Sequence, residues 1–325
     1  MTAVVPIPSS LDDATFEQVA AKLAEVPADA KVLVDARHAR WASPYGLTAL
    51  LALAQSRAVR PSFAPPEAEE TLSYWGRAGF FTHAEDVYEF TRAVPRAKAA
   101  GESAVLLGIT RIAAASDVHE IVGRIQERAT AILRDGLGLD PRSTMRFSMT
   151  LSEACQNVTE HAGCDGWVAV QSYTWRQRLG RRVVVIAVCD AGIGFRKSLE
   201  SNAGRPRSDR WDDGMALEEG VLRNVSRFRE SGRGQGLSQI RAFVTKFQGK
   251  LAVRSGTARI ALVPEWDDDV ALREGLAPFP GAQVQITIPE AAAAPAAGAA
   301  GRGGSAKATP ARPAAARPAP EPDFF

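Results

Sequence analysis

The first hundred residues alternate between short apolar runs and segments with helical apolar spacing, and this pattern predicts a small α/β unit over residues 1–98. Its strongest helical segment, Gly46–Ala58, is apolar at most positions, and the run Lys31–Asp35 has the composition of a buried strand. A stretch with proline and glycine, 93–101, is expected to be a linker. The other predicted elements of this unit are a strand at Ala3–Ile7 and helices at Leu11–Leu23 and around Leu72–Phe80.

Residues 102–290 show the same two periods and predict a second, larger α/β unit with a mixed sheet. The polar, aperiodic stretch 195–231 is expected to be a loop, and loops of that length are usually kept for function. The segment 291–325, rich in Ala, Pro and Gly, cannot bury a core, so we expect a disordered tail. The tail repeats the pair Arg-Pro, so two roles stay open for it: a segment that binds a partner, or a flexible tail that aids solubility. The expected helices are Asp117–Arg134, Ser143–Ala162 and Gly236–Phe247, and the expected strands are Ser103–Thr110, Trp167–Trp175, Arg182–Cys189, Lys250–Arg254, Arg259–Val263 and Ala282–Ile288.

Composition narrows the class of protein. A chain of 325 residues, 46% apolar and 23% charged, is typical of two soluble domains with a tail. The net charge of +2 does not favour nucleic acid or a membrane as a partner, and no apolar run is long enough to span a bilayer. Cys155, Cys164 and Cys189 have neither metal-ligand spacing nor the number for a disulfide framework, and no signal peptide pattern opens the chain. A cytoplasmic protein is therefore expected.

Three polar residues share one face of the predicted helix Ser143–Ala162. Glu153, Asn157 and His161 stand four residues apart, and each step of four turns an α-helix by about 400°, so their side chains point the same way. A carboxylate beside an amide suits magnesium chemistry, in which the amide oxygen takes the metal and the carboxylate takes a proton. An ordinary solvated helix face is the alternative, and it is the preferred one for this motif standing alone.

A second candidate follows the apolar run 183–189. Asp190 ends this predicted strand, and Gly192 and Gly194 come directly after it. A carboxylate at the end of a buried strand can accept a hydrogen bond from the exocyclic amine of adenine, and glycines let the backbone approach a base. A common Asp-Gly turn that closes a hairpin is the alternative.

The third candidate is a glycine-rich turn that runs into a predicted helix, Gly232-Arg233-Gly234-Gln235-Gly236-Leu237. The backbone N–H groups of such a turn and the helix N-terminus can cradle phosphates, and Arg233 can reach a terminal phosphate. The turn is neither a Walker A loop nor a dinucleotide-binding fingerprint. A flexible loop before a helix is the alternative.

In this order the three motifs resemble the N, G1 and G2 boxes of the GHKL ATPase superfamily, which includes gyrase-type topoisomerases, Hsp90, MutL, histidine kinases and anti-sigma serine kinases. The resemblance covers about residues 102–290 and implies a GHKL (Bergerat) α/β sandwich that binds ATP and Mg²⁺. It implies that Glu153 is the general base, Asn157 the Mg²⁺ ligand and Asp190 the adenine contact. The stretch 195–231 becomes the ATP lid, which ends with the glycine-rich turn at residue 236.

The segment LSEACQNVTEHAG is most similar to the anti-sigma serine kinase version of the N box. In one respect the chain departs from the family, which usually has Gly-Thr at the start of the last strand, where the hydroxyl helps to hold adenine. Here that step is Gly281-Ala282. The residues implied to contact ATP are Asn157, His161, Asp190, Gly192, Gly194, Gly232, Gly234, Gly236 and Leu237, with Glu153 and Arg233 acting in catalysis.

The N-terminal unit is similar to a STAS domain, the fold of anti-sigma antagonists, through the segment KVLVDARHARWASPYGLTALLALA. Where that family has Asp-Ser-Ser/Thr-Gly, this chain has Ser43-Pro44-Tyr45-Gly46. The acceptor serine of the family is thus replaced, and the resemblance implies a docking domain. Phosphorylation of Ser43 or Tyr45 is the weaker alternative.

Together the two resemblances imply an ATP-binding regulatory protein, an anti-sigma-type serine protein kinase or ATPase that acts through protein–protein interaction. Its partner would be another regulatory protein, a STAS-type antagonist or a sigma-like factor, and the family also allows a homodimer. A nucleotide-gated binding module without phosphotransfer is the alternative. A histidine kinase that uses His119 ranks last, because its helix adjoins the ATPase unit directly and no second helix is expected to complete a dimerisation hairpin.

Overall fold

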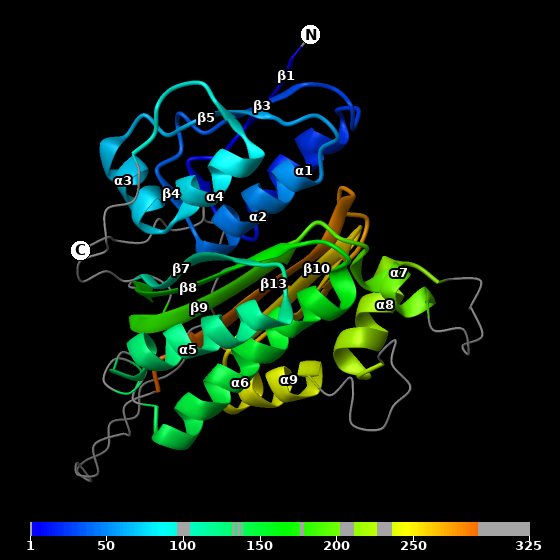
Figure 1. Ribbon diagram of the computed structural model, residues 1–325. Coiled ribbons are helices and arrows are strands. Elements are labelled where there is room, and N and C mark those ends of the chain that lie inside the picture. The colour runs from blue at the N-terminus through cyan, green and yellow to red at the C-terminus, as the bar shows by residue number, and fades with distance from the viewer. Residues whose placement is uncertain are drawn as a thin grey trace, which may run out of the picture.

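The computed structural model describes residues 2–95, 105–131, 134, 137, 139–175, 179–201, 211–225 and 236–291. It contains helices with both parallel and antiparallel sheets, so the expected α/β class is confirmed. Figure 1 shows an N-terminal α/β unit on one side of a central sheet and a layer of helices on the other side. Most of the predicted linker, 96–101, and most of the predicted tail, 292–325, lie outside the described residues.

The N-terminal unit is built on a parallel sheet with strand order β1-β3-β5-β6. The helix predicted around Leu72–Phe80 is in fact two helices, because Gly79 between them has a left-handed φ of 83°. The first helix also begins later than predicted, since Leu11 pairs in a short strand. The strands are β1 (Ala3–Pro6), β2 (Ser10–Leu11), β3 (Val32–Asp35), β4 (Trp41–Ala42), β5 (Ser62–Ala64) and β6 (Glu89–Phe90), and the helices are α1 (Phe16–Ala24), α2 (Pro44–Gln55), α3 (Glu69–Arg77) and α4 (Phe80–Val87).

Helix α2 is the most buried helix of this unit. Ser43 caps it by accepting a hydrogen bond from the Gly46 N–H at 3.0 Å, and Pro44 occupies the first turn, where no N–H is needed. Every residue from 44 to 54 is buried. A helix that is apolar all round has to be covered on all sides. Figure 1 shows how this is achieved, because α2 lies between the N-terminal strands and the central sheet.

The central sheet has seven strands in the order β12-β11-β10-β13-β9-β8-β7. A mixed sheet was expected, but every pairing among its described strands is antiparallel, so that expectation was wrong. Short connections join β8 to β9 and β10 to β11, and a connection that short can join only antiparallel neighbours. The strands are β7 (Val105–Ile112), β8 (Gly166–Trp175), β9 (Arg181–Asp190), β10 (Lys250–Gly256), β11 (Ala258–Leu262), β12 (Leu272–Arg273) and β13 (Phe279–Pro289).

The helices of the second unit include three segments within the stretch 195–231 that was expected to be a loop. Asp212 caps the segment Asp213–Leu217 by accepting a hydrogen bond from the Met215 N–H. Leu217 and Val221 enter the core, so a few apolar residues were enough to form helices in this polar stretch. The helices are α5 (Ala115–Ala131), α6 (Pro141–Asn157), α7 (Gly194–Glu200), α8 (Asp213–Leu217) and α9 (Gly236–Lys246), with π-helical turns η2 (Val158–Ala162) and η3 (Glu218–Leu222).

Strand β9 shows how the two sides of the sheet are covered. Successive side chains of a strand point to opposite faces. Ile186 and Val188 therefore pack with the helical layer, whereas Ala187 and Cys189 pack with the N-terminal unit. Asp190 follows in the same alternation and lies on the helical side. Within the described residues, no helix combines the length and the apolar character needed to cross a lipid bilayer.

Candidate functional site

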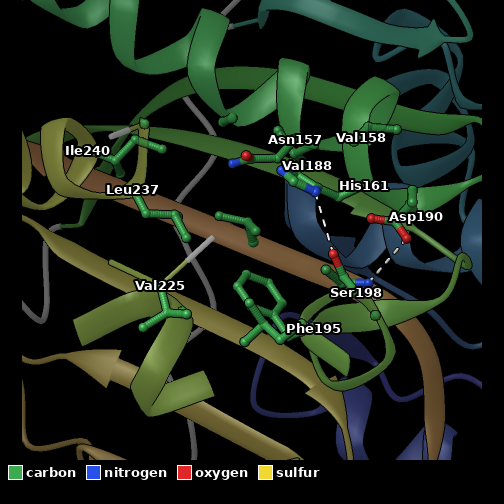
Figure 2. Close-up of a pocket in the computed structure, with 18 residues that line it drawn as sticks. Asn157, Val158, His161, Val188, Asp190, Phe195, Ser198, Val225, Leu237 and Ile240 are labelled. Carbon is green, nitrogen blue, oxygen red and sulfur yellow. Dashed lines mark hydrogen bonds between the residues drawn. The ribbon is translucent and has the colours of Figure 1, made fainter. Parts of the chain in front are cut away.

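One cleft opens on the helical side of the sheet, at the end of β9, with an empty space of about 880 Å³ when its mouth is included. Figure 2 shows Asn157 and His161 entering it from the α6–η2 segment and Asp190 from β9, with Phe195 of α7 opposite. Three separate sequence motifs thus meet at one place. The apolar and small side chains that complete the walls are Ala154, Val158, Ala162, Val188, Leu199, Gly220, Val225, Leu237, Ile240, Ala282 and Val284.

Of the residues predicted from the motifs, the structure brings together Asn157, His161, Asp190, Gly194, Gly236 and Leu237 as lining residues. Gly192 lies behind Asp190, where its N–H donates to Asp190 Oδ1 at 2.9 Å. Glu153 lies one helical turn before Asn157, beside the start of α9. Gly232, Arg233 and Gly234 lie outside the described residues.

Asp190 is the polar centre of the cleft and is only 5% exposed. Its Oδ1 accepts hydrogen bonds from the backbone N–H groups of Gly192, at 2.9 Å, and Ala282, at 3.3 Å. Burial raises the pKa of Asp190 to about 6, and these two hydrogen bonds act in the opposite direction. A carboxyl group fixed by backbone donors at the end of an apolar cleft can recognise one donor group of a ligand.

Close packing explains the glycines that follow Asp190. A Cβ built on Gly192 would lie 2.1 Å from the carbonyl oxygen of Ala162, which is backbone and cannot move aside. Gly194 has a φ of 72°, and a Cβ there would lie 2.7 Å from Ser255 Oγ. Both glycines are therefore required by the approach of neighbouring backbone and side chains.

Helix α6 ends at Asn157, five residues before the predicted end, and continues as the π-helical turn η2. A π-helical turn holds more residues than an α-helical turn, and such turns are frequent at functional sites. His161 on η2 still lines the cleft, with Nδ1 3.4 Å from Ser198 Oγ. Figure 2 shows this contact across the cleft.

Glu153 is half-buried at the edge of the cleft. A Cβ built on Gly236 would lie 2.3 Å from Glu153 Oε2, so the carboxylate is packed against the first residue of α9. Burial raises the pKa of Glu153, and the negative charge of Glu160 raises it further. A carboxylate with a raised pKa beside a helix N-terminus is suited to proton transfer.

Metal-ligand chemistry at this place is limited to few protein groups. Among the described residues, no three His, Cys, Asp or Glu side chains cluster as a metal site. The amide oxygen of Asn157 is a suitable ligand for Mg²⁺, which commonly binds one or two protein groups together with phosphate oxygens and water. The residues present therefore fit a magnesium ion that arrives with a phosphate ligand.

The sequence motifs did not reveal the opposite wall of the cleft. Phe195, Ser198 and Leu199 of α7 line it, as does Val225 after η3. Ser198 and Leu199 stand three and four residues after Phe195, and this spacing is a helical signal. It was hidden by the polar composition of the stretch 195–231.

The loop at residues 43–46, whose sequence was compared with a STAS phosphoacceptor, is buried. Ser43 and Tyr45 are each 2% exposed, and the Ser43 hydroxyl already caps α2. The Tyr45 ring packs edge-on against Phe16, and burial raises its pKa well above the usual range. Neither hydroxyl can be reached by a kinase in this conformation.

The N-terminal unit packs on the reverse side of the strands that carry the cleft. Thr48 of α2 donates from Oγ1 to Cys189 Sγ at 3.2 Å, and Cys189 is the residue before Asp190. Tyr74 donates from its hydroxyl to Gln171 Oε1 at 2.8 Å.

The chain matches no protein-family model, and no curated protein matches it significantly.

Proposed function

We propose that this chain is an ATP-binding regulatory protein, in which a GHKL-type ATPase unit at 102–290 carries a STAS-like unit at 1–98. One observation carries the proposal. Asp190, Asn157 and His161, which come from two sequence motifs far apart in the chain, meet in a single cleft with otherwise apolar walls. A largely apolar cleft with a few convergent polar groups is the usual form of a small-molecule site.

The inner end of the cleft suits a flat aromatic base. Val188, two residues before Asp190 on β9, and Val284, which pairs with Val188 from β13, offer apolar contacts to one of its faces. The carboxylate of Asp190 accepts a hydrogen bond from an exocyclic amine, which adenine presents. A base with a carbonyl at the same position cannot donate this hydrogen bond. Adenine is therefore the base that we assign to this end.

The outer end suits the phosphates. The N-terminus of α9 at Gly236 offers backbone N–H groups and a partial positive charge. Asn157 is the protein ligand for a magnesium ion that would arrive with ATP and neutralise the charge of its phosphates. Glu153 accepts the proton of the attacking hydroxyl, either from a protein serine or from water, and its raised pKa improves it as a base near neutral pH.

The proposed chemistry is that of an anti-sigma-type serine protein kinase or an ATPase, with another regulatory protein as its partner. One observation favours the second candidate, a nucleotide-gated binding module without phosphotransfer. The only hydroxyls on the STAS-like loop, those of Ser43 and Tyr45, are buried, so that loop offers no acceptor within the chain.

Binding of ATP with Mg²⁺, measured by calorimetry, tests the proposal. We compare the wild type with Asp190→Asn and with a control, Asp165→Asn, which changes an Asp that pairs with Arg111 outside the cleft. Wild type and control are expected to bind alike, and Asp190→Asn is expected to lose about tenfold or more in affinity, which corresponds to ~1.4 kcal/mol or more. Absence of binding to the wild type would refute the proposal.

Transfer from γ-labelled ATP then separates the two candidates. A kinase or ATPase releases or transfers label in a manner that depends on Glu153, whereas a binding module holds ATP without turnover. An acid-labile label that depends on His119 would instead identify a histidine kinase.

A further inference from the structure

A buried glutamine holds the start of β13 to Asp190 on the β9 side, while the other side of β13 pairs with β10. The antiparallel pairing of β13 with β9 ends at Gln283 opposite Cys189. Beyond it Gly281 turns with a left-handed φ of 77°. The carbonyl oxygen of Asp190 instead accepts a hydrogen bond from Gln283 Nε2 at 2.9 Å, and the same nitrogen donates to the carbonyl of Pro280 at 2.9 Å.

The orientation of this amide follows from its neighbours. Both groups that face Nε2 are backbone carbonyls, which only accept, so the nitrogen has to point toward them. Gln283 is 0% exposed, and its Oε1 has no hydrogen-bond partner among the described residues. An unpaired buried amide oxygen is costly, and an apolar side chain of similar size would avoid that cost. What Gln283 adds is therefore the placement of the two carbonyls.

That placement fixes the Asp190 carboxyl. A Cβ built on Gly281 would lie 2.2 Å from the carbonyl oxygen of Asp190, so the turn passes directly over this residue. The next residue of the turn, Ala282, donates its N–H to Asp190 Oδ1 at 3.3 Å, and both residues line the cleft. Gln283 ties the turn to Asp190 and so sets where the carboxyl stands in the cleft.

We propose that Gln283 is a positioning residue for base recognition, which makes the cleft select a purine with an exocyclic amine over one with a carbonyl at that position. This inference rests on the proposed function. A hydrogen bond discriminates between two such bases only when its acceptor is held in place, because a mobile carboxyl relaxes away from the wrong base.

Gln283→Met removes both N–H donors and keeps the approximate shape of the side chain. Gln285→Met is the matched control, since Gln285 is also buried on the same face of β13, opposite Ala187 and three residues along β9 from Asp190. The affinities for ATP and GTP are measured by calorimetry with Mg²⁺, and thermal unfolding without nucleotide verifies the fold.

We expect Gln283→Met to reduce the ratio of ATP affinity to GTP affinity by about tenfold, and Gln285→Met to leave it within about twofold. An unchanged ratio in Gln283→Met overturns the inference, and so does an equal loss for both nucleotides, which is the mark of a purely structural role. If Gln283→Met does not fold, Gln283→Asn replaces it, because Asn keeps the amide but withdraws it by one methylene.

A measurement without nucleotide separates this inference from the proposed function. The Gly192 N–H is bonded to Asp190 Oδ1, so its hydrogen exchange reports how firmly the carboxyl is held. Exchange at Gly192 is expected to accelerate in Gln283→Met and to match the wild type in Gln285→Met. Failure of the wild type to bind any nucleotide refutes the proposed function alone, whereas unchanged exchange in Gln283→Met refutes the positioning role.

Discussion

A buried ion pair fastens the N-terminal unit to the central sheet. Arg254 of β10 is 1% exposed, and it donates to both carboxylate oxygens of Glu17 on α1, from Nε at 2.8 Å and from Nη2 at 3.1 Å. The same guanidinium donates to the carbonyls of Gly256, at 3.2 Å, and Ala277, at 2.6 Å. It also lies 5.6 Å from the ring centroid of Phe279. This cation cannot return to water unless the two units separate.

Glu17→Ala would leave the guanidinium buried without its counter-ion. Breaking a buried pair from one side costs about 3–5 kcal/mol, and we expect about 3 kcal/mol because two carbonyls still accept from Arg254. For a chain of this size about 2–4 °C is lost per kcal/mol, so the melting temperature should fall by about 6–12 °C. Thermal unfolding followed by circular dichroism, with urea unfolding for the free energy, measures the effect.

Glu25→Ala is the control for this experiment, because Glu25 pairs with Lys22 at 3.3 Å with both side chains more than half exposed. Its removal should change the free energy of unfolding by less than about 0.5 kcal/mol. Adding Arg254→Met to Glu17→Ala should recover part of the loss, since the unpaired charge is then gone. A Glu17→Ala protein as stable as the control would show that the pair is solvated and that the two units do not unfold together.

Three further predictions concern the cleft. Because burial raises the pKa of Asp190 to about 6, ATP affinity should fall as the pH is lowered through about 6. Because its pKa is raised, the native protein binds the proton of Asp190 more tightly than the unfolded chain does. The contribution of Asp190 to the free energy of unfolding should therefore be fully present below about pH 3.8 and should be lost as the pH rises through about 6. The difference between wild type and Asp190→Asn in calorimetric pH series measures both effects. Gly192→Ala should destabilise by about 1–3 kcal/mol and abolish nucleotide binding, because its Cβ meets the Ala162 carbonyl. Gly123→Ala, at a helical site with nothing within 4 Å, should stabilise by about 0.5–1 kcal/mol in the same melting assay. Glu153→Gln should retain ATP binding in calorimetry while phosphate release or transfer falls by about 10²–10⁴-fold; unchanged turnover would remove Glu153 from the role of base.

Local sequence pattern was sufficient for the elements that carry the cleft. The apolar run before Asp190 predicted a buried strand, and β9 ends at that residue. The four-residue spacing of Asn157 and His161 placed both on one face, and both line the cleft although the helix changes its period between them. These predictions succeeded because strand burial and helical phase depend on neighbours in the sequence.

Features that depend on distant contacts were not predictable. The walls formed by α7 and η3 lie in a polar stretch, and their few apolar residues become a core only when the sheet is beside them. The antiparallel order of the central sheet was missed because β13 enters between β9 and β10 from far along the chain. Gln283 gave no signal, since its function depends on where two carbonyls meet in space.

The position of the N-terminal unit changes what a STAS-like resemblance implies for this chain. Helix α2 was predicted as strongly apolar, and a helix with no polar face requires cover on two sides. The second cover is the reverse face of the sheet, where Thr48 contacts the residue that precedes Asp190. A unit fastened there by buried ion pairs cannot exchange with a free partner through this surface unless the charged groups are exposed to water. The N-terminal unit therefore packs behind the strands that carry the proposed nucleotide site, and any exchangeable partner would have to bind at a different surface.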